Sequence, residues 1–199
     1  MERDLRDSAS GTSFVEVLFS LGVVSVCAAM AVPSLLTSLD DIRTAGAVRY
    51  LTAQLQRTRM QALARTTDTA VRFSPSGESY RYGVFVDGNR NGIRTQEVEA
   101  GIDAQVGPFE QLSDHFPGVD FGALAELPPV DPGGTPPGDD PIRLGVSDTL
   151  TFTPHGTATA GGVYILGRGR MQYAIRIYGE TGRTRALRFD TRARRWRAL

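Results

Sequence analysis

The chain is poor in the residues on which most enzymes and disulfide-rich proteins depend. Its 199 residues include one cysteine, Cys27, two histidines, His115 and His155, and no lysine. A single thiol excludes an internal disulfide and a multi-cysteine metal site. Neither histidine has a nucleophile at a recognisable spacing, and the sequence has no phosphate-binding loop and no G-x-G-x-x-G fingerprint. These absences predict a protein that is not an enzyme.

Basic and acidic residues are segregated along the chain, although the net charge is zero and every basic residue is arginine. Residues 1–94 carry 11 arginines and 9 acidic residues, residues 95–142 carry 10 acidic residues and no arginine, and residues 143–199 carry 11 arginines and 3 acidic residues. The acidic part contains many prolines and glycines, which predict an exposed loop over residues 126–142. Charged runs of this kind usually lie on solvated faces.

One long apolar run, Val17–Leu36, contains no charged residue. Twenty helical residues rise about 30 Å, which is the thickness of the hydrocarbon part of a membrane. A cleaved secretory signal, an ordinary membrane anchor and a more specialised segment all fit a run of this length. A secretory signal has a basic leader and a short apolar core. Here the leader mixes two arginines with three acidic residues, and the apolar run continues through Pro33.

Glu16 lies at the entrance of the apolar run, directly after Phe14 and Val15. A carboxylate close to the membrane interior is costly and predicts a partner of opposite charge. Alternatively, Glu16 only marks the boundary between water and membrane.

The run G-T-S-F-V-E-V-L-F-S-L at residues 11–21 resembles the cleavage and methylation motif of type IV pilins and type II secretion pseudopilins. The resemblance implies that a prepilin peptidase cuts after Gly11 and methylates the amine of Thr12, which stands where phenylalanine is usual. It also implies that Glu16 is the fifth residue of the mature chain and that Pro33 is the helix-interrupting proline at position 22.

In this family the new N-terminal amine of one subunit pairs with the glutamate of a neighbour, which implies that Glu16 acts in filament assembly. Proline removes one intrahelical hydrogen bond, so Pro33 is expected to bend or loosen the helix. The implied partners are a prepilin peptidase, an inner-membrane assembly platform and other pilin-like subunits. The implied location is the bacterial inner membrane, crossed once, with the C-terminal domain in the periplasm.

A second helical stretch follows the apolar run, because residues 37–66 lack a Gly/Pro cluster and place apolar residues three, four or seven positions apart. The members of this expected stripe are Leu39, Ile42, Val48, Leu51, Leu55 and Ala62. From residue 69 the apolar period changes to two in short segments rich in β-branched and aromatic residues, which predicts strands. These segments are 69–74, 80–86, 148–153, 162–167, 171–178 and 184–190.

The sequence therefore predicts an α+β fold, in which a long N-terminal helix packs on a small antiparallel β-domain. The expected parts are a leader peptide (1–11), a transmembrane and filament-core helix (12–36), its amphipathic continuation (37–66) and a β-rich domain (67–199). The domain resembles that of the H-type pseudopilins and FimT-like minor pilins. The segments that carry this resemblance are F-S-P-S-G (73–77), V-F-V-D-G-N-R-N-G (84–92), F-T-P-H-G-T-A (152–158) and G-E-T-G-R-T-R (179–185).

Asp87, Asn89 and Asn91 place oxygen atoms at alternating positions before a glycine, as at the start of an EF-hand calcium loop. The closing glutamate of such a loop belongs at position 98, where this chain has Val98. A turn of aspartate, asparagine and glycine between strands needs no metal. We therefore expect no cofactor, with calcium as the lesser alternative.

The C-terminal segment 183–197 holds seven arginines against one acidic residue. Arginines with an interleaved aromatic residue suit phosphate contacts and base stacking. Some FimT-like proteins that serve DNA uptake carry a G-R-x-R motif, and Gly182, Arg183 and Arg185 match it. Two plain alternatives are an arginine-bearing edge strand and docking against acidic residues. The candidate DNA contacts are Arg183, Arg185, Arg188, Arg192, Arg194, Arg195 and Trp196.

Overall fold

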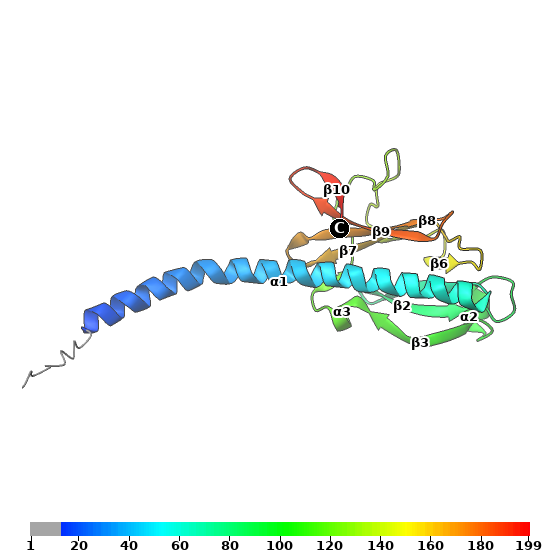
Figure 1. Cartoon of the computed structure of the whole chain (residues 1–199), viewed down its shortest axis with the longest axis horizontal. Helices are drawn as coiled ribbons and strands as arrows, with labels where there is room; N and C mark the ends of the chain where they lie inside the picture. The colour runs from blue at the N-terminus through cyan, green and yellow to red at the C-terminus, as the bar shows by residue number, and fades with distance from the viewer. Residues whose placement is uncertain (1–12) are drawn as a thin grey trace, which may run out of the picture. The chain divides into compact units, whose positions relative to one another are not determined.

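The computed structural model describes residues 13–199, so Gly11 and Thr12 lie outside the described residues. The chain divides into two compact units, one up to Leu39 and one from Asp40 to Leu199. Helix α1 (Phe14–Arg65) supplies the helical part of the first unit and begins the second. Figure 1 shows the helix and the strands that follow it.

The first half of α1 is exposed along its whole length, because every residue from Ser13 to Leu39 has an exposed side chain. Its serine and threonine hydroxyl groups donate to the carbonyl four residues earlier, as Ser20 does to Glu16 at 2.7 Å and Thr37 does to Pro33 at 3.0 Å. These bonds remove polar hydroxyl groups from the apolar surface. The helix is continuous through Pro33.

The second half of α1 supplies one wall of the hydrophobic core. Its buried residues recur every three or four positions, which is the period of one helical face. They are Thr44, Ala47, Val48, Leu51, Leu55, Thr58 and Ala62. The predicted stripe was wrong at its beginning, since Leu39 and Ile42 are 46% and 67% exposed. At about 100° per residue, Leu39 projects opposite Val48 and Ile42 about 120° away from it.

The helix ends at Arg65 in a left-handed turn. Thr66 has φ +52°, and the Thr67 amide donates to the Ala62 carbonyl at 3.3 Å. This bond closes a Schellman motif, in which the left-handed position is usually glycine.

Two antiparallel sheets follow the helix. The first has the order β3-β2-β1-β6, and the second has the order β10-β9-β8-β7-β4, with β5 also paired to β7. The strands are β1 (Thr69–Ser76), β2 (Ser79–Val86), β3 (Ala104–Gln111), β4 (Val119–Phe121), β5 (Ile142–Arg143), β6 (Thr149–Phe152), β7 (Gly161–Gly167), β8 (Gln172–Tyr178), β9 (Arg183–Asp190) and β10 (Arg195–Ala198). The short helices are α2 (Thr95–Glu99), α3 (Leu112–His115) and the 3₁₀ turn η1 (Arg168–Arg170).

The buried half of α1 and both sheets enclose one core. Leu51 and Leu55 of the helix join Val71 and Phe73 of β1 and Ile175 of β8, all of them at most 2% exposed. The predicted α+β fold, a long helix packed on an antiparallel β-domain, is confirmed.

Helix α1 and strand β7 approach each other closely at Gly167. A Cβ atom at this position would lie 2.1 Å from the Thr44 Oγ1 atom and 3.0 Å from its Cβ atom. The absence of a side chain at Gly167 therefore sets the spacing between α1 and the second sheet.

Residues 122–141, which we call the strap, cross the face of the second sheet that points away from α1. Leu127 is 3% exposed and packs with Tyr164 and Ala174, so the prediction of a freely exposed loop was wrong for this residue. The buried Gln172 side chain holds the start of the strap, since its Oε1 accepts the Leu124 amide at 2.9 Å and its Nε2 donates to the Gly122 carbonyl at 3.1 Å. The strap fills a sheet face that would otherwise be apolar and open.

Electrostatic contacts hold the middle of the strap. The Arg176 Nε atom lies 2.6 Å from the Asp131 carboxylate, in an ion pair that joins the arginine-rich part of the sequence to the acidic part. The Trp196 indole N–H donates to the Pro128 carbonyl at 3.0 Å. Within the C-terminal segment, Arg188 and Arg197 also pair with carboxylates of the same chain, those of Asp41 and Asp190, as the docking alternative for these arginines expects.

Candidate functional site

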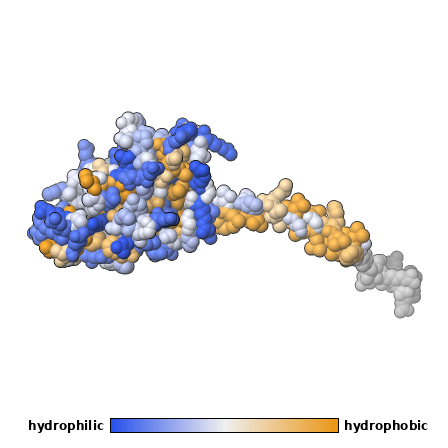
Figure 2. Space-filling model, turned by 180° about the vertical axis from the view of Figure 1, so that it is seen from behind, coloured by the Kyte–Doolittle hydropathy of each residue, from blue (hydrophilic) through white to orange (hydrophobic). Residues whose placement is uncertain are grey.

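The exposed half of α1 is the most unusual surface of the molecule. Phe14, Phe19 and Met30 are each more than 70% exposed. An 18-residue window of this helix has a mean hydropathy of 2.2 and is not buried, so by length and composition it can cross a membrane. Figure 2 shows the apolar residues gathered along this half of the helix. Water is a poor solvent for such a surface, which must be covered by lipid or by other apolar helices.

Glu16 lies in the first turn of this helix, with its side chain exposed. Its backbone amide donates to the Ser13 carbonyl at 3.0 Å. Within residues 13–199 no salt bridge involves Glu16. The carboxylate therefore remains available to a cation from outside the described part of the chain.

The sheet separates the C-terminal arginines onto two faces. Register pairs Arg185 with Arg176 and Arg183 with Tyr178, on the face that carries the strap. Arg188 lies on the opposite face, where its Nη1 atom is 3.1 Å from the Asp41 carboxylate of α1. Side chains alternate between faces along a strand, so the run of arginines does not form a single surface.

The other C-terminal arginines lie at and beyond the end of β9. Arg192 and Arg194 belong to the β9–β10 turn, and Arg195 begins β10 opposite Asp190. All three are exposed. The Asp190 carboxylate accepts the Arg192 amide at 3.0 Å and pairs with Arg197 at 2.8 Å.

Trp196 and Gly182 both have roles inside the domain. The Trp196 ring packs against Phe189 and Tyr164, with ring centroids 5.2 and 6.1 Å apart. Gly182 has φ +59°, and a Cβ there would lie 2.7 Å from the Gly156 carbonyl oxygen and 2.9 Å from the Arg59 Nε atom. Packing and backbone geometry therefore account for both residues without a nucleic acid.

The predicted calcium-type loop is closed by its own hydrogen bonds. The Asp87 carboxylate accepts the amides of Asn89, Arg90 and Gly92 at 3.0, 2.7 and 2.7 Å. Asp103, 1% exposed, accepts the amides of Gly88 and Arg94 at 3.3 and 3.1 Å. Both aspartates thus serve the backbone of the turn.

Glu97 completes this loop, one position before the expected closing residue. Its Oε1 atom accepts the side-chain amides of Asn91 at 2.8 Å and Asn89 at 3.3 Å. Among residues 13–199 no group of three or more histidine, cysteine, aspartate or glutamate side chains is placed to hold a metal ion.

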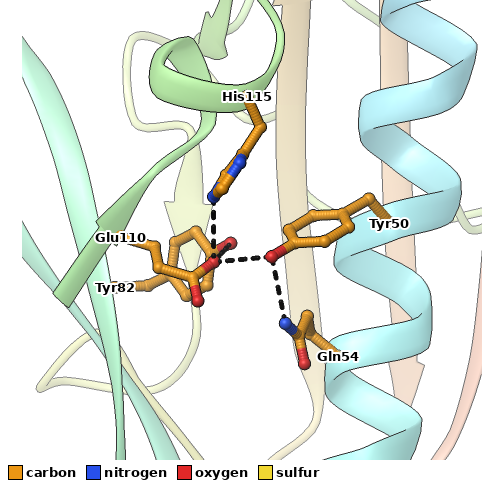
Figure 3. Close-up of polar contacts among 5 residues, drawn as sticks. All are labelled: Tyr50, Gln54, Tyr82, Glu110 and His115. Atoms are coloured by element: carbon orange, nitrogen blue, oxygen red, sulfur yellow. Dashed lines mark hydrogen bonds and ion pairs between the residues drawn. The ribbon is translucent and has the colours of Figure 1, made fainter. Parts of the chain in front are cut away.

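A polar cluster that the sequence did not predict joins α1 to the first sheet (Figure 3). The Glu110 Oε2 atom of β3 accepts the hydroxyl groups of Tyr50 at 2.8 Å and Tyr82 at 2.9 Å. His115 of α3 approaches the same oxygen at 3.5 Å, and Gln54 donates to the Tyr50 hydroxyl at 3.1 Å. The bonds connect segments 28 to 60 residues apart in the sequence, so spacing gave no signal for them.

Burial raises the pKa of the Tyr82 hydroxyl, and the adjacent Glu110 carboxylate raises it further. The same two effects act on Tyr173, where burial and the Asp41 carboxylate raise the pKa to about 12. Both hydroxyl groups therefore stay protonated and act as hydrogen-bond donors to a carboxylate. These hydrogen bonds join β8 to α1 and β2 to β3.

Comparisons with known proteins give one similar structure. No family model matches the chain, and no curated protein sequence matches it. Among solved structures, the minor pseudopilin EpsH from the Type 2 Secretion System of Vibrio cholerae is similar over 73% of this chain and 97% of its own, with 14% sequence identity and a TM-score of 0.45.

Proposed function

We propose that this protein is a structural subunit of a secretion pseudopilus or type IV pilus, of the pseudopilin or minor pilin kind. The observation that carries the proposal is the exposed apolar half of α1 with one carboxylate, Glu16, in its first turn. An ordinary membrane anchor has no need of a carboxylate at this place. The resemblance of residues 11–21 to the pilin cleavage motif supports the same reading.

In this proposal the precursor is held in the bacterial inner membrane by α1, with the β-domain in the periplasm. A prepilin peptidase removes residues 1–11 and methylates Thr12. The assembly platform then transfers the helix from lipid into a bundle formed with the helices of other pilin-like subunits. The apolar surface is covered in both environments, which allows the transfer.

Glu16 neutralises the N-terminal amine of a neighbouring subunit in the filament. An unpaired charge in an apolar bundle is strongly unfavourable, whereas the two charges together satisfy one another. Pro33 leaves one carbonyl of the helix without its amide partner, which eases adjustment of the helix to its neighbours.

The proposal is tested by co-expressing the full chain with a prepilin peptidase and measuring its intact mass. We expect the loss of residues 1–11 and a new N-terminus at Thr12. A retained leader would exclude the pilin role and favour a plain membrane anchor.

Glu16→Ala should be cleaved normally but should be excluded from filaments, because the neighbour's amine is left unpaired. Glu16→Gln should behave in the same way, since it keeps the size and loses the charge. Ser20→Ala, one turn further along the helix, is the control and should assemble. The measurement is the amount of each variant in sheared or crosslinked filaments, and normal entry of Glu16→Ala would contradict the pairing.

A second candidate function is DNA contact through Arg183 and Arg185, in the manner of a FimT-like minor pilin that serves DNA uptake. Both side chains are exposed, and no salt bridge within residues 13–199 involves either. In detergent, full-length protein should then bind duplex DNA less tightly as salt rises, and Arg183→Ala/Arg185→Ala should flatten the slope of log K against log salt by about two units.

The matched control for this pair is Arg57→Ala/Arg65→Ala, which removes two exposed arginines from α1. It should leave the salt slope at its original value. Equal losses from both double variants would show a general charge effect, and absence of binding at low salt would exclude DNA contact.

A further inference from the structure

A cleft opens between the start of the strap and one end of the second sheet. Its volume is about 510 Å³, within the range of ligand-binding pockets. Leu127, Met171 and Phe189 give it an apolar lining. Arg170 and Arg194 line it from two separate turns, whereas Arg188 lines it from β9 with its guanidinium paired to Asp41 on the opposite face of the sheet. The cleft lies at the end of β9 remote from Arg183 and Arg185, because these residues begin the strand and Arg188 and Phe189 end it.

Arg170 and Arg194 are the arginines of the cleft that no carboxylate in the described part of the chain neutralises. Arg188 pairs with Asp41 at 3.1 Å, and Arg194 donates to the Glu126 backbone carbonyl at 3.4 Å. In the described part of the chain, no salt bridge involves Arg170 or Arg194. Glu126 is the one acidic residue among those that line the cleft. The cleft therefore combines an apolar lining with an excess of positive charge.

Backbone strain is also concentrated here. Six non-glycine residues among 13–199 have positive φ, and three of them line this cleft: Glu126 at 60°, Arg170 at 64° and Arg194 at 47°. Left-handed backbone is unfavourable for such residues and tends to persist where it serves a function. A glycine would adopt the backbone conformation of Arg170 without strain, as the neighbouring Gly169 does at φ +67°. The chain instead has an exposed arginine at this position of the cleft.

We propose that this cleft binds an acidic peptide segment of a neighbouring filament subunit, in which carboxylates flank an apolar side chain. Arginine guanidinium groups bind carboxylates with two parallel hydrogen bonds, and the lining of Leu127, Met171 and Phe189 covers the apolar side chain. The apolar lining favours a peptide over a bare phosphate backbone. The identification of the partner as a subunit rests on the proposed function, and the cleft itself does not.

The test uses the full chain in detergent micelles and the fluorescent peptide Leu-Asp-Phe-Glu-Leu, blocked at both ends, with Leu-Asn-Phe-Gln-Leu as the uncharged control. Anisotropy at low salt should show binding of the acidic peptide at least tenfold tighter than of the control peptide. Arg170→Gln should weaken this binding about tenfold, while Arg183→Gln, which removes an exposed arginine at the other end of β9, should leave it within twofold.

Arg170→Gly separates a binding role from a structural one. It should raise the melting temperature, because glycine accepts φ +64° without strain, and yet it should weaken the acidic peptide about tenfold. Thr66→Gly, which relieves the same kind of strain at the end of α1, should also raise the melting temperature but should leave peptide binding unchanged.

Four results would overturn the inference: no binding of the acidic peptide by wild type, equal binding of the two peptides, equal losses from Arg170→Gln and Arg183→Gln, or displacement of the peptide by duplex DNA that itself depends on Arg170. Leader removal and filament entry are measured on the same variants. If wild type loses its leader but does not bind the acidic peptide, the cleft inference fails and the filament proposal stands. If wild type binds the acidic peptide but keeps its leader, the reverse holds.

Discussion

At the scale of single residues, several side chains stand where backbone geometry favours a different residue. Thr66 ends α1 in a left-handed conformation that glycine adopts at no steric cost. The Schellman bond from Thr67 to Ala62 fixes this conformation whatever the residue at position 66. A local cost is therefore built into the end of the helix.

We expect Thr66→Gly to stabilise the protein by about 1 kcal/mol, because relief of the strain exceeds the added flexibility of the unfolded chain. Chemical denaturation monitored by circular dichroism measures this change. Thr66→Ala keeps a Cβ atom and serves as the control, with little or no gain. A loss of stability in Thr66→Gly would show that the threonine side chain makes a stabilising contact.

At the scale of elements, strands with strict alternation could be predicted, and those that break the pattern could not. β3 contains Gly107 and Pro108, which lower strand propensity but are tolerated because β3 lies at the edge of its sheet. β10 consists of R-W-R-A, which has no β-branched residue, and no strand was predicted for it. The C-terminal end of α1 was predicted to within one residue. The predicted apolar stripe began too far towards the N-terminus, at Leu39, because residue spacing does not show where the compact unit begins.

The candidate site divides in the same way. Glu16 and the apolar run were visible in the sequence because they are local. The arginine cleft was not, since Arg170 and Arg194 come from different turns and meet only after β8 and β9 pair. The strap was predicted as a loop, but burial of Leu127 depends on a sheet face formed by residues much later in the chain.

The packing of α1 on β7 yields a prediction for this pair of elements. Gly167→Ala should destabilise the protein by about 1–3 kcal/mol, because its Cβ would lie 2.1 Å from the Thr44 Oγ1 atom and force helix and sheet apart. Thr44→Ala in the same chain removes that hydroxyl and should restore part of the loss. Thermal unfolding of the two single variants and the double variant measures this coupling. Additive losses would contradict direct contact.

At the scale of the whole molecule, two buried tyrosines donate hydrogen bonds to carboxylates on neighbouring elements. Tyr173 of β8 donates to Asp41 of α1 at 2.8 Å, and Tyr82 of β2 donates to Glu110 at 2.9 Å. Both hydroxyl groups have raised pKa values in the folded protein. In the unfolded chain the two tyrosine hydroxyl groups therefore ionise at a lower pH than in the folded protein, so the stability of the domain falls when the pH is high enough to ionise them.

The free energy of unfolding should fall as pH rises from 10 to 12. In the unfolded chain Tyr173 ionises near its ordinary pKa of 10.0, whereas in the folded protein its pKa is about 12, so its contribution is complete below pH 10 and is lost through pH 12. Tyr173→Phe should show a shallower decline, and Tyr178→Phe, a partly exposed tyrosine, is the control. Denaturation at several pH values measures both. Equal slopes in all three proteins would exclude Tyr173 as a cause.

The long sequence separation between α1 and the strands that cover it has a consequence for folding during synthesis. Tyr173 contacts Asp41 across 132 residues, and Gln56 donates to Thr184 across 128. Synthesis delivers the N-terminal helix first, and contacts of this range form slowly. For most of translation the apolar stripe of α1 has no β8 or β9 to cover it. A nascent chain stopped before residue 172 would expose that stripe, so aggregation of truncated products should increase sharply as the stop moves upstream of β8.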